Sequence, residues 1–377
     1  MKRKTISSID PSTGKEWRKF ELPTAEEVKA CIDRAHKAYL HNRSVPLQER
    51  IKKVLNIADI LEKRKQECAE LMAKEMGKPV KFGVLEVNEV IGIMKHKASV
   101  AEFALEPKTL HPCNKKAYSI LQPTGIHFCV HPWNFPFWTV MNTFTASLLS
   151  GMSVIEKPSH GIPQCAYLVE EIVKQAGFDQ NEYQVCMVES SMIELVISDK
   201  RVTGVSITGS TSAGKNVGML AGKYVKPVLL ELGGSDAFVV LEDADLKKAI
   251  TQAAIGRLAN SGQVCVAAKR MIVHEKVYDK FVAGLVEEVK RWKVGNPLNP
   301  DTFMGPLARM DLFEIVRKQV KESVEAGAKV AYGDLEQLKG PRAADKGNFF
   351  HPMVLTDIPK GAPARDGIFI DGLNANR

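Results

Sequence analysis

Short apolar runs alternate with amphipathic helical segments through the middle and second half of the chain. The runs include GIHFCV, MSVIEK, VTGVSIT and AFVVL, and helical spacing recurs between them, as in PQCAYLVEEIVKQ. Strands that alternate with helices are joined by right-handed crossovers and form a parallel sheet. The pattern resumes beyond Asp243, with a strand at KRMIVH and a long helix behind it. We therefore predict an α/β protein with two α/β units that meet near Gly234.

Residues 24–105 precede this alternation and are expected to be helical. Thr24 and Glu27 form a capping-box pattern ahead of VKACIDRAHKAYL, in which each side chain bonds the other residue's amide. Pro46 can open the next helix, and Gly77 can close a later one.

Length and composition limit the class of protein. A chain of 377 residues suggests two domains, and 45% hydrophobic with 25% charged residues is ordinary for a soluble protein. The chain has no apolar stretch of about 18 residues that would predict a transmembrane helix. Its start, MKRKTISSIDPSTGKEW, lacks the apolar run of a signal peptide. We therefore expect a cytoplasmic protein without a membrane partner.

Charge and cysteine usage argue against two further classes. The net charge is +8, but lysines alternate with glutamates in helical segments such as ERIKKVLNIADILEKRKQE. This alternation is typical of a solvated surface, so we predict no nucleic-acid partner; a field that steers anionic ligands is the second interpretation. The seven cysteines contain no CxxC pair and are spread along the chain, at positions 31, 68, 113, 129, 165, 186 and 265. We predict a reducing compartment, no disulfide framework and no metal site.

A glycine-rich turn, SITGSTSAGKNVG at residues 206–218, permits three interpretations. Gly209, Gly214 and Lys215 fit the phosphate loop of nucleotide hydrolases, although Asn216 replaces the hydroxyl that ligates magnesium there. The turn also fits a helix N-cap that binds no ligand. Thirdly, it fits a dinucleotide pyrophosphate at a helix N-terminus, where amides and the helix dipole favour anions. The turn alone leaves these alternatives open.

Three other tight turns carry groups suited to acyl transfer. HPWNFP contains Trp133 and Asn134, ELGG contains Glu231, and NSGQVC contains Cys265. Taken singly, the asparagine has an ordinary explanation as a turn residue, the glutamate as an ion-pair partner and the cysteine as a core residue. Together an amide, a carboxylate and a thiol are the parts of a covalent acyl-transfer site.

Five motifs carry a family resemblance: HPWNFPFW, EKPS, SITGST, ELGG and NSGQVCVAAKR. In this order they resemble the aldehyde dehydrogenase superfamily, over nearly the whole chain from IDPSTGKEW to TDIPKGAPA at residues 356–364. The run ELGGSDAFVVLEDADL looks most like the succinate-semialdehyde branch. The resemblance implies an aldehyde dehydrogenase-like α/β fold, with a Rossmann-type parallel-sheet cofactor domain and an α/β catalytic domain.

The resemblance also implies a chemistry and its residues. The family oxidises small aldehydes to carboxylic acids with NAD or NADP, through a thiohemiacetal and a thioester on cysteine. Cys265 would be that nucleophile, the Asn134 amide and the Cys265 backbone N–H would stabilise the oxyanion, and Glu231 would be the general base.

The cofactor would contact a second set of residues. Gly209 and Ser210 match the positions that face the pyrophosphate, and Lys157 matches the lysine near the adenine ribose. His160 replaces a glutamate that many NAD-preferring relatives carry, so we predict that NADP is accepted at least as well as NAD. The complete set of predicted cofactor-binding residues is Trp133, Lys157, His160, Gly209, Ser210 and Leu232.

Two positions depart from the family pattern. In similar succinate-semialdehyde enzymes an arginine after the WNFP turn can meet the distal carboxylate of the substrate, and the corresponding residue here is Asn142. After GAPA the family continues with a glutamate that holds the nicotinamide ribose, whereas this chain reads RDGIFIDGLNANR. We therefore expect a catalytic domain that is incomplete at its C-terminus, with impaired hydride transfer. A non-catalytic remnant that retains nucleotide binding is the alternative.

The resemblance divides the chain into domains. We predict an NAD(P)-binding domain at 1–233, with an oligomerisation arm near 106–123, a partial catalytic domain at 234–364 and a divergent tail at 365–377. The resemblance implies a homo-oligomer, and we expect weaker assembly here than in the family.

Overall fold

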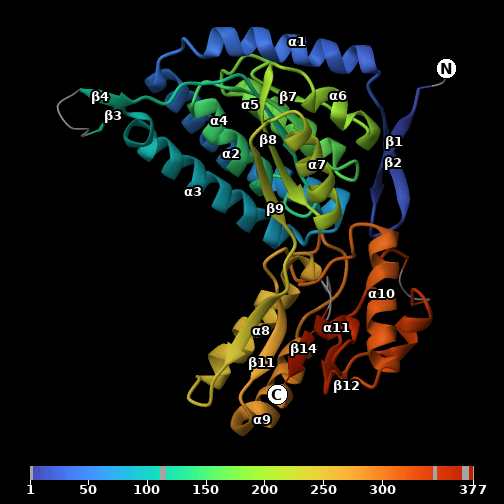
Figure 1. The fold of residues 1–377 in the computed structure, drawn as a ribbon. Helices are drawn as coiled ribbons and strands as arrows, with labels where there is room; N and C mark the ends of the chain where they lie inside the picture. Colours follow the sequence, from blue (N-terminus) through green and yellow to red (C-terminus); the bar gives the residue numbers. More distant parts are fainter. Residues whose placement is uncertain (1–2, 111–115, 343–345, 367–372, 377) are drawn as a thin grey trace. The chain divides into compact units, whose positions relative to one another are not determined.

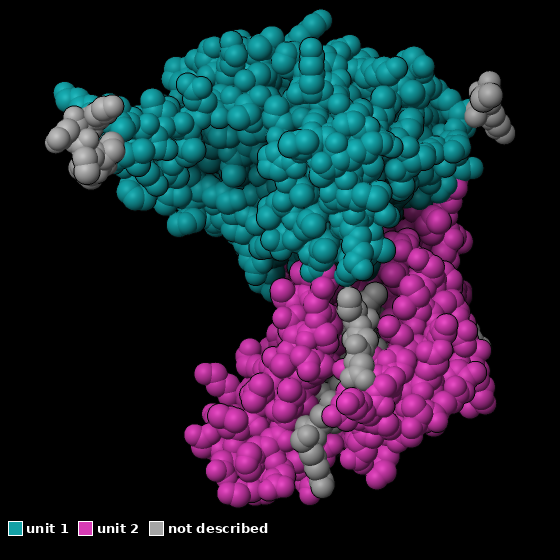
Figure 2. Space-filling model, viewed as in Figure 1, with its two compact units in different colours: residues 1–8, 19–68, 84–232 teal, residues 9–18, 69–83, 233–377 magenta. Residues whose placement is uncertain are grey.

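The chain forms two compact units in the computed structural model (Figures 1 and 2), which describes residues 3–110, 116–342, 346–366 and 373–376. Unit 1 comprises Met1–Ser8, Lys19–Cys68 and Val84–Leu232, and unit 2 comprises Ile9–Arg18, Ala69–Gly83 and Gly233–Arg377. The sequence-based division places residues 9–18 and 69–83 in the first domain, but they belong to the second unit. These segments join unit 2 through long-range contacts that local sequence patterns do not reveal.

Unit 1 is built on a five-stranded parallel sheet. The strands are β5 (Ile126–Val130), β6 (Ser153–Lys157), β7 (Tyr183–Val185), β8 (Val202–Gly209) and β9 (Val228–Leu232). Their order in the sheet is β7-β6-β5-β8-β9, and every neighbouring pair is parallel. This order places the first strand in the middle, as in Rossmann-type sheets. The predicted parallel sheet is confirmed.

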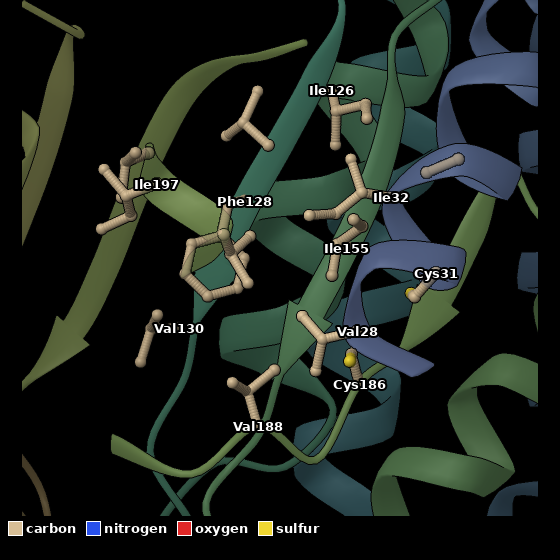
Figure 3. Packing of buried hydrophobic residues seen from close by; sticks show 14 of the residues in the cluster. Val28, Cys31, Ile32, Ile126, Phe128, Val130, Ile155, Cys186, Val188 and Ile197 are labelled. Carbon is tan, nitrogen blue, oxygen red and sulfur yellow. The ribbon is translucent and has the colours of Figure 1, made fainter. Parts of the chain in front are cut away.

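The two faces of this sheet are covered by different helices. Helices α1 (Ala25–Asn42), α6 (Ile193–Ile197) and α7 (Thr211–Lys223) share one apolar cluster with the sheet, in which Phe128 and Ile155 lie among Val28, Ile32 and Ile197 (Figure 3). Because strand side chains alternate between faces, the intervening residues of β5 point to the opposite face. There His127 reaches Ser147 of α4 (Trp138–Leu149). Helix α5 (Pro163–Gln175) connects β6 to β7.

The remaining elements that contribute to unit 1 are two long helices and two hairpins. Helices α2 (Leu47–Met76) and α3 (Val80–Leu105) follow α1, whose predicted capping box is present between Thr24 and Glu27. Strands β1 (Thr5–Asp10) and β2 (Lys15–Glu21) form one two-stranded sheet. Strands β3 (Lys108–Leu110) and β4 (Ala117–Ser119) form the other, within the predicted arm.

Unit 2 contains a mixed five-stranded sheet with helices. Its strands lie in the order β10 (Asp236–Val240), β11 (Ala268–Val273), β14 (Leu373–Asn376), β13 (Val354–Thr356) and β12 (Lys329–Tyr332), and the β12–β13 pair alone among these described pairs is antiparallel. The sequence-based division sets residues 365–377 apart as a tail, but Leu373–Asn376 pair in the middle of this sheet. Its helices are α8 (Leu246–Leu258), α9 (Glu275–Lys290), α10 (Met310–Glu325) and α11 (Pro363–Asp366), with short 3₁₀ turns at Ala259–Gly262 and Leu335–Lys339.

One apolar core of unit 2 lies between α8, α9 and the strands β10 and β11, and another includes Phe313 and Val316 of α10. Phe281, Leu285 and Val289 recur on one face of α9 and are buried with Met271 and Val273 of β11. Within the described residues, no helix is both long and apolar enough to cross a membrane.

Candidate active site

The predicted site residues of unit 1 follow the carboxyl ends of its strands. Asn134 follows β5, Lys157 ends β6, Ser210 follows β8 and Glu231 lies at the end of β9. The strand register aligns Val130 with Lys157 and with Ile207. It also aligns Gly209 with Leu232. The structure therefore brings these residues to one edge of the sheet, which is where open α/β sheets bind ligands.

The turn that carries Asn134 is fixed by a carboxylate from a distant helix. Glu86 of α3 is buried, and its Oε1 accepts hydrogen bonds from the backbone N–H groups of Phe137 at 2.9 Å and Trp138 at 3.0 Å. These are first-turn amides of α4, which lack partners within their own helix. The negative charge also faces the positive end of the helix dipole. Glu86 thus sets where α4 begins and how the chain leaves the Trp133–Asn134 turn.

A second buried carboxylate lies on the other side of this turn. His131 directly follows β5, and its Nδ1 lies 2.7 Å from Oε2 of Glu156 on β6. Its Nε2 lies 3.1 Å from Oγ1 of Thr143 on α4. Both members of the His131–Glu156 pair are buried. Sequence reasoning missed Glu86, His131 and Glu156 because their partners are far away in the chain.

The glycine-rich turn is a helix N-cap. Strand β8 ends at Gly209, the Ser210 hydroxyl accepts from the Ala213 N–H at 3.3 Å, and α7 begins at Thr211. Five residues up to Lys215 are thus already helical and cannot wrap around a phosphate. The phosphate-loop interpretation is therefore wrong.

Gly214 has a packing role instead of a phosphate-binding role. A Cβ atom at this position would lie 2.4 Å from Cδ2 of Leu232, so the leucine side chain would have to move. The glycine therefore lets α7 lie directly against the end of β9, where Glu231 and Leu232 are found.

Two basic side chains lie at the end of β6 and just beyond it. Burial lowers the pKa of Lys157, although the nearby Glu156 carboxylate opposes this shift. The pKa of His160 is lowered by burial and then by the Lys157 charge, and its Nε2 lies 3.3 Å from the Val188 carbonyl oxygen. The carboxylate of Glu189 acts in the opposite direction on His160 and is itself paired with Lys4 at 2.8 Å. Lys157 and His160 thus form a small cluster of basic side chains.

Cys265 lies in unit 2, at the end of an unusual loop. Asn260, Ser261 and Gly262 have φ angles of 53°, 56° and 75°. Left-handed backbone costs about 1–2 kcal/mol for each residue other than glycine. Such a run persists where the surroundings hold it.

Buried side chains hold this loop. Ser261 Oγ donates to the Gly305 carbonyl at 2.9 Å. Gln263 Oε1 accepts from the Ala308 N–H at 3.0 Å, and its Nε2 donates to the Asn260 carbonyl at 3.1 Å. The loop is further tied by two buried cations: Arg257 donates to the Gly262 carbonyl at 3.1 Å, and Lys269 donates to the carbonyl of Cys265 itself. The thiol is therefore carried on a preorganised turn.

Exposure distinguishes Cys265 from the other cysteines. Cys265 is exposed, and the other cysteines of the described residues, at positions 31, 68, 129, 165 and 186, are buried; position 113 lies outside them. Burial raises the pKa of Cys68 to about 12 and that of Cys129 well above its usual value. A thiol in such surroundings stays protonated and unreactive. The accessible nucleophile among these thiols is Cys265.

Comparison with known proteins identifies the family. Residues 1–369 match the sequence model of the Aldehyde dehydrogenase family. The chain belongs to this family. It is 36% identical over 358 residues to a protein named succinate-semialdehyde dehydrogenase [NADP(+)] 1 from Mycobacterium tuberculosis, covering 94% of this chain and 77% of the relative. A probable succinate-semialdehyde dehydrogenase [NADP(+)] from Synechocystis is 35% identical over 358 residues, covering 95% and 78%.

Solved structures of the family share the fold. The structure of succinic semialdehyde dehydrogenase from Streptococcus pyogenes in complex with NADP⁺ has a TM-score of 0.94 and 32% identity, covering 98% of this chain and 81% of that one. Another solved structure, of the protein Gox0499, has a TM-score of 0.95 and 37% identity, covering 99% and 81%. The resemblance to the family and the aldehyde dehydrogenase-like α/β fold are confirmed.

Proposed function

We propose that this chain oxidises an aldehyde to the carboxylic acid with NADP or NAD, using Cys265 as the nucleophile. The observation that carries the proposal is the exposed thiol on a left-handed loop held by buried side chains. A reactive cysteine needs an accessible and fixed position, and the other described cysteines are buried. A non-catalytic remnant is not favoured, because the family match spans residues 1–369, the range that contains Asn134, Glu231 and Cys265.

The proposed reaction has two stages on the thiol. The Cys265 thiolate adds to the aldehyde carbon and forms a C–S bond, and the carbonyl oxygen becomes an oxyanion that the Asn134 amide and the Cys265 N–H stabilise. The bound cofactor would supply the acceptor for the hydride that leaves this carbon, which turns the adduct into a thioester. Glu231 then removes a proton from water, the hydroxide attacks the thioester, and the acid departs as the thiolate is restored.

The residues at the edge of the unit 1 sheet fit a dinucleotide. Gly209, Ser210 and the first amides of α7 offer donors for a pyrophosphate. Lys157, at the end of β6, and His160, three residues later, offer basic groups. Trp133 and Leu232 are partly buried residues at the same edge and would complete the walls of the binding site.

We propose NADP as the preferred cofactor. The relatives from Mycobacterium tuberculosis and Synechocystis are named for NADP⁺. His160 offers no carboxylate that would repel a 2′-phosphate, and the Glu189 charge next to it is paired with Lys4. Measurement of kcat/KM with both cofactors tests this choice, and a hundredfold preference for NAD⁺ would contradict it.

We propose that the substrate is an aldehyde with a distal carboxylate, of the succinate-semialdehyde type. Asn142 cannot provide the cation that an arginine would provide, but the ammonium of Lys97 on α3 donates to the Asn142 carbonyl. Burial lowers the pKa of Lys97, and a carboxylate ligand nearby would offset this cost. A panel of semialdehydes and plain aliphatic aldehydes tests this substrate class, and equal kcat/KM values for the two would contradict it.

The test of the activity is aldehyde-dependent growth of the absorbance of the reduced nicotinamide. We expect turnover by the wild type, none by Cys265→Ala, and normal turnover by Val266→Ala, which changes the exposed neighbour. No aldehyde-dependent reduction by the wild type, or undiminished turnover by Cys265→Ala, would refute the proposed function.

A further inference from the structure

We propose that the buried His131–Glu156 pair is a positioning element for the turn that carries Asn134. This inference rests on the proposed function, in which Asn134 stabilises the oxyanion. His131 lies three residues before Asn134, directly after β5. Its imidazole bonds β6 through Glu156 Oε2 at 2.7 Å and α4 through Thr143 Oγ1 at 3.1 Å. The ring therefore connects the elements that flank the turn.

Hydrogen bonds connect His131 to three neighbours. The Thr143 hydroxyl lies 2.9 Å from the Thr139 carbonyl and 3.1 Å from Nε2 of His131, and it can donate to either. The Glu156 carboxylate accepts from Nδ1–H, and the backbone N–H of His131 donates to the Lys157 carbonyl at 3.1 Å. Hydrogen bonds to an ionised carboxylate are shorter and stronger than those between neutral groups. Three bonds thus fix one residue at the start of the turn.

Glu86 fixes the other end of the same turn, through the N–H groups of Phe137 and Trp138. The segment 132–136 is therefore held at both ends by buried carboxylates that come from α3 and β6. An oxyanion donor acts only if it is aimed before the reaction begins. The His131–Glu156 pair would orient Asn134 in this way at the end of the turn that follows β5.

His127 of β5 provides a matched control. It lies four residues before His131, which directly follows this strand, and its Nδ1 lies 2.7 Å from Oγ of Ser147 on α4. It therefore connects the same strand to the same helix, but at the end that is remote from the turn. A role limited to folding predicts similar effects of the two substitutions, whereas a positioning role predicts different ones.

The experiment compares His131→Leu with His127→Leu in the full chain. We expect His131→Leu to lower kcat by about a hundredfold, equally for ester hydrolysis and for aldehyde oxidation, because both need the Asn134 amide. The Kd of NADP⁺ should change much less than kcat, because Trp133 is the only proposed cofactor-binding residue that lies in this turn. His127→Leu should change kcat by less than about threefold.

Variants of Glu156 test the connection itself. Glu156→Leu should reproduce the loss in kcat, and the double variant with His131→Leu should be no more than about threefold worse, because both remove one interaction. Glu156→Gln should retain most of the activity, since its amide oxygen still accepts from Nδ1–H and the Thr143 hydroxyl can turn to donate to Nε2. If the leucine variants do not fold, His131→Gln replaces His131→Leu in the comparison with the same expected direction.

Hydrogen exchange separates the positioning role from the proposed function. In His131→Leu the backbone amides of Trp133, Asn134 and Phe135 should exchange faster, and in His127→Leu they should not. If the wild type lacks both activities, the proposed function fails and the exchange result alone decides the positioning role. Equal loss of kcat in the two histidine variants, or unchanged exchange in His131→Leu, would overturn the inference.

Discussion

Replacing Gln263 with methionine should release the loop that carries Cys265. The methionine has a similar length, so the change leaves little empty space. It removes the carboxamide that accepts from the Ala308 N–H at 3.0 Å and donates to the Asn260 carbonyl at 3.1 Å. The side chain of Gln263 is buried, so water cannot replace these partners directly.

The structure sets the size of the effect. A buried polar group left without a partner costs about 1–3 kcal/mol. The Ala308 N–H loses its acceptor, whereas the Asn260 carbonyl keeps the Gln263 backbone N–H at 3.1 Å, so the change predicts a loss of about 1–3 kcal/mol in the free energy of unfolding. The left-handed backbone of Asn260 and Ser261 stores a strain of about 2–4 kcal/mol. The release of this strain favours relaxation of the loop once the carboxamide is gone. Relaxation displaces Cys265, and a displacement of about 1 Å lowers turnover by about a hundredfold.

The assay combines urea unfolding with ester hydrolysis on the same preparation. Ester hydrolysis needs no hydride acceptor and therefore reports on the thiol loop without the cofactor. Val266→Ala is the control, because its exposed side chain is a neighbour of the thiol in the same loop. If Gln263→Met unfolds within about 0.5 kcal/mol of the wild type and keeps its turnover, the loop is not held by this carboxamide.

Four further predictions follow from the same geometry. Iodoacetamide should label Cys265 before any buried cysteine, and peptide mapping of Cys265→Ser should show the fast phase gone. His160→Glu should lower kcat/KM for NADP⁺ by at least about tenfold relative to NAD⁺, because like charges placed together cost more than about 1.4 kcal/mol; an unchanged ratio would remove His160 from the cofactor site. Glu86→Ala should destabilise unit 1 by about 3 kcal/mol or more, because it removes two hydrogen bonds to a charged acceptor. Glu86→Gln should destabilise the unit by less. Burial lowers the pKa of His127 from 6.5 to about 4. The free energy of unfolding should therefore fall by up to about 3 kcal/mol as the pH is lowered from 6.5 to about 4, and His127→Gln should flatten this pH dependence.

Local patterns predicted the regular elements of this chain well. The alternation of apolar runs and helices is decided by side chains close together in sequence, and it gave the parallel sheet of unit 1. The capping box at Thr24 is likewise a contact across three residues. The turns that end β5, β8 and β9 were also visible, because proline and glycine mark them directly in the sequence.

The supports of these turns could not be predicted in the same way. Glu86 contacts a helix start that is 51 residues away, and His131 contacts a glutamate 25 residues away. In the sequence Glu86 is one glutamate of a helical segment, and Gln263 is one polar residue beside a cysteine. Their roles depend on burial, which only the folded chain defines.

The glycine-rich turn shows that similar sequence motifs can contain glycine for different structural reasons. A phosphate loop needs glycines because the backbone must curve around an anion, so its residues cannot be helical. Here Gly214 is inside α7, and its missing Cβ leaves room for the Leu232 side chain, which a larger residue at this position would displace. Leu232 follows Glu231 on β9, so this glycine governs how closely the helix approaches the strand end that carries the proposed general base. Gly214→Ala should therefore displace the Leu232 side chain beside Glu231 and lower the rate of the deacylation step of ester hydrolysis, while the rate at which iodoacetamide labels Cys265 stays unchanged. If the alanine variant hydrolyses esters normally, the close approach has a structural role alone.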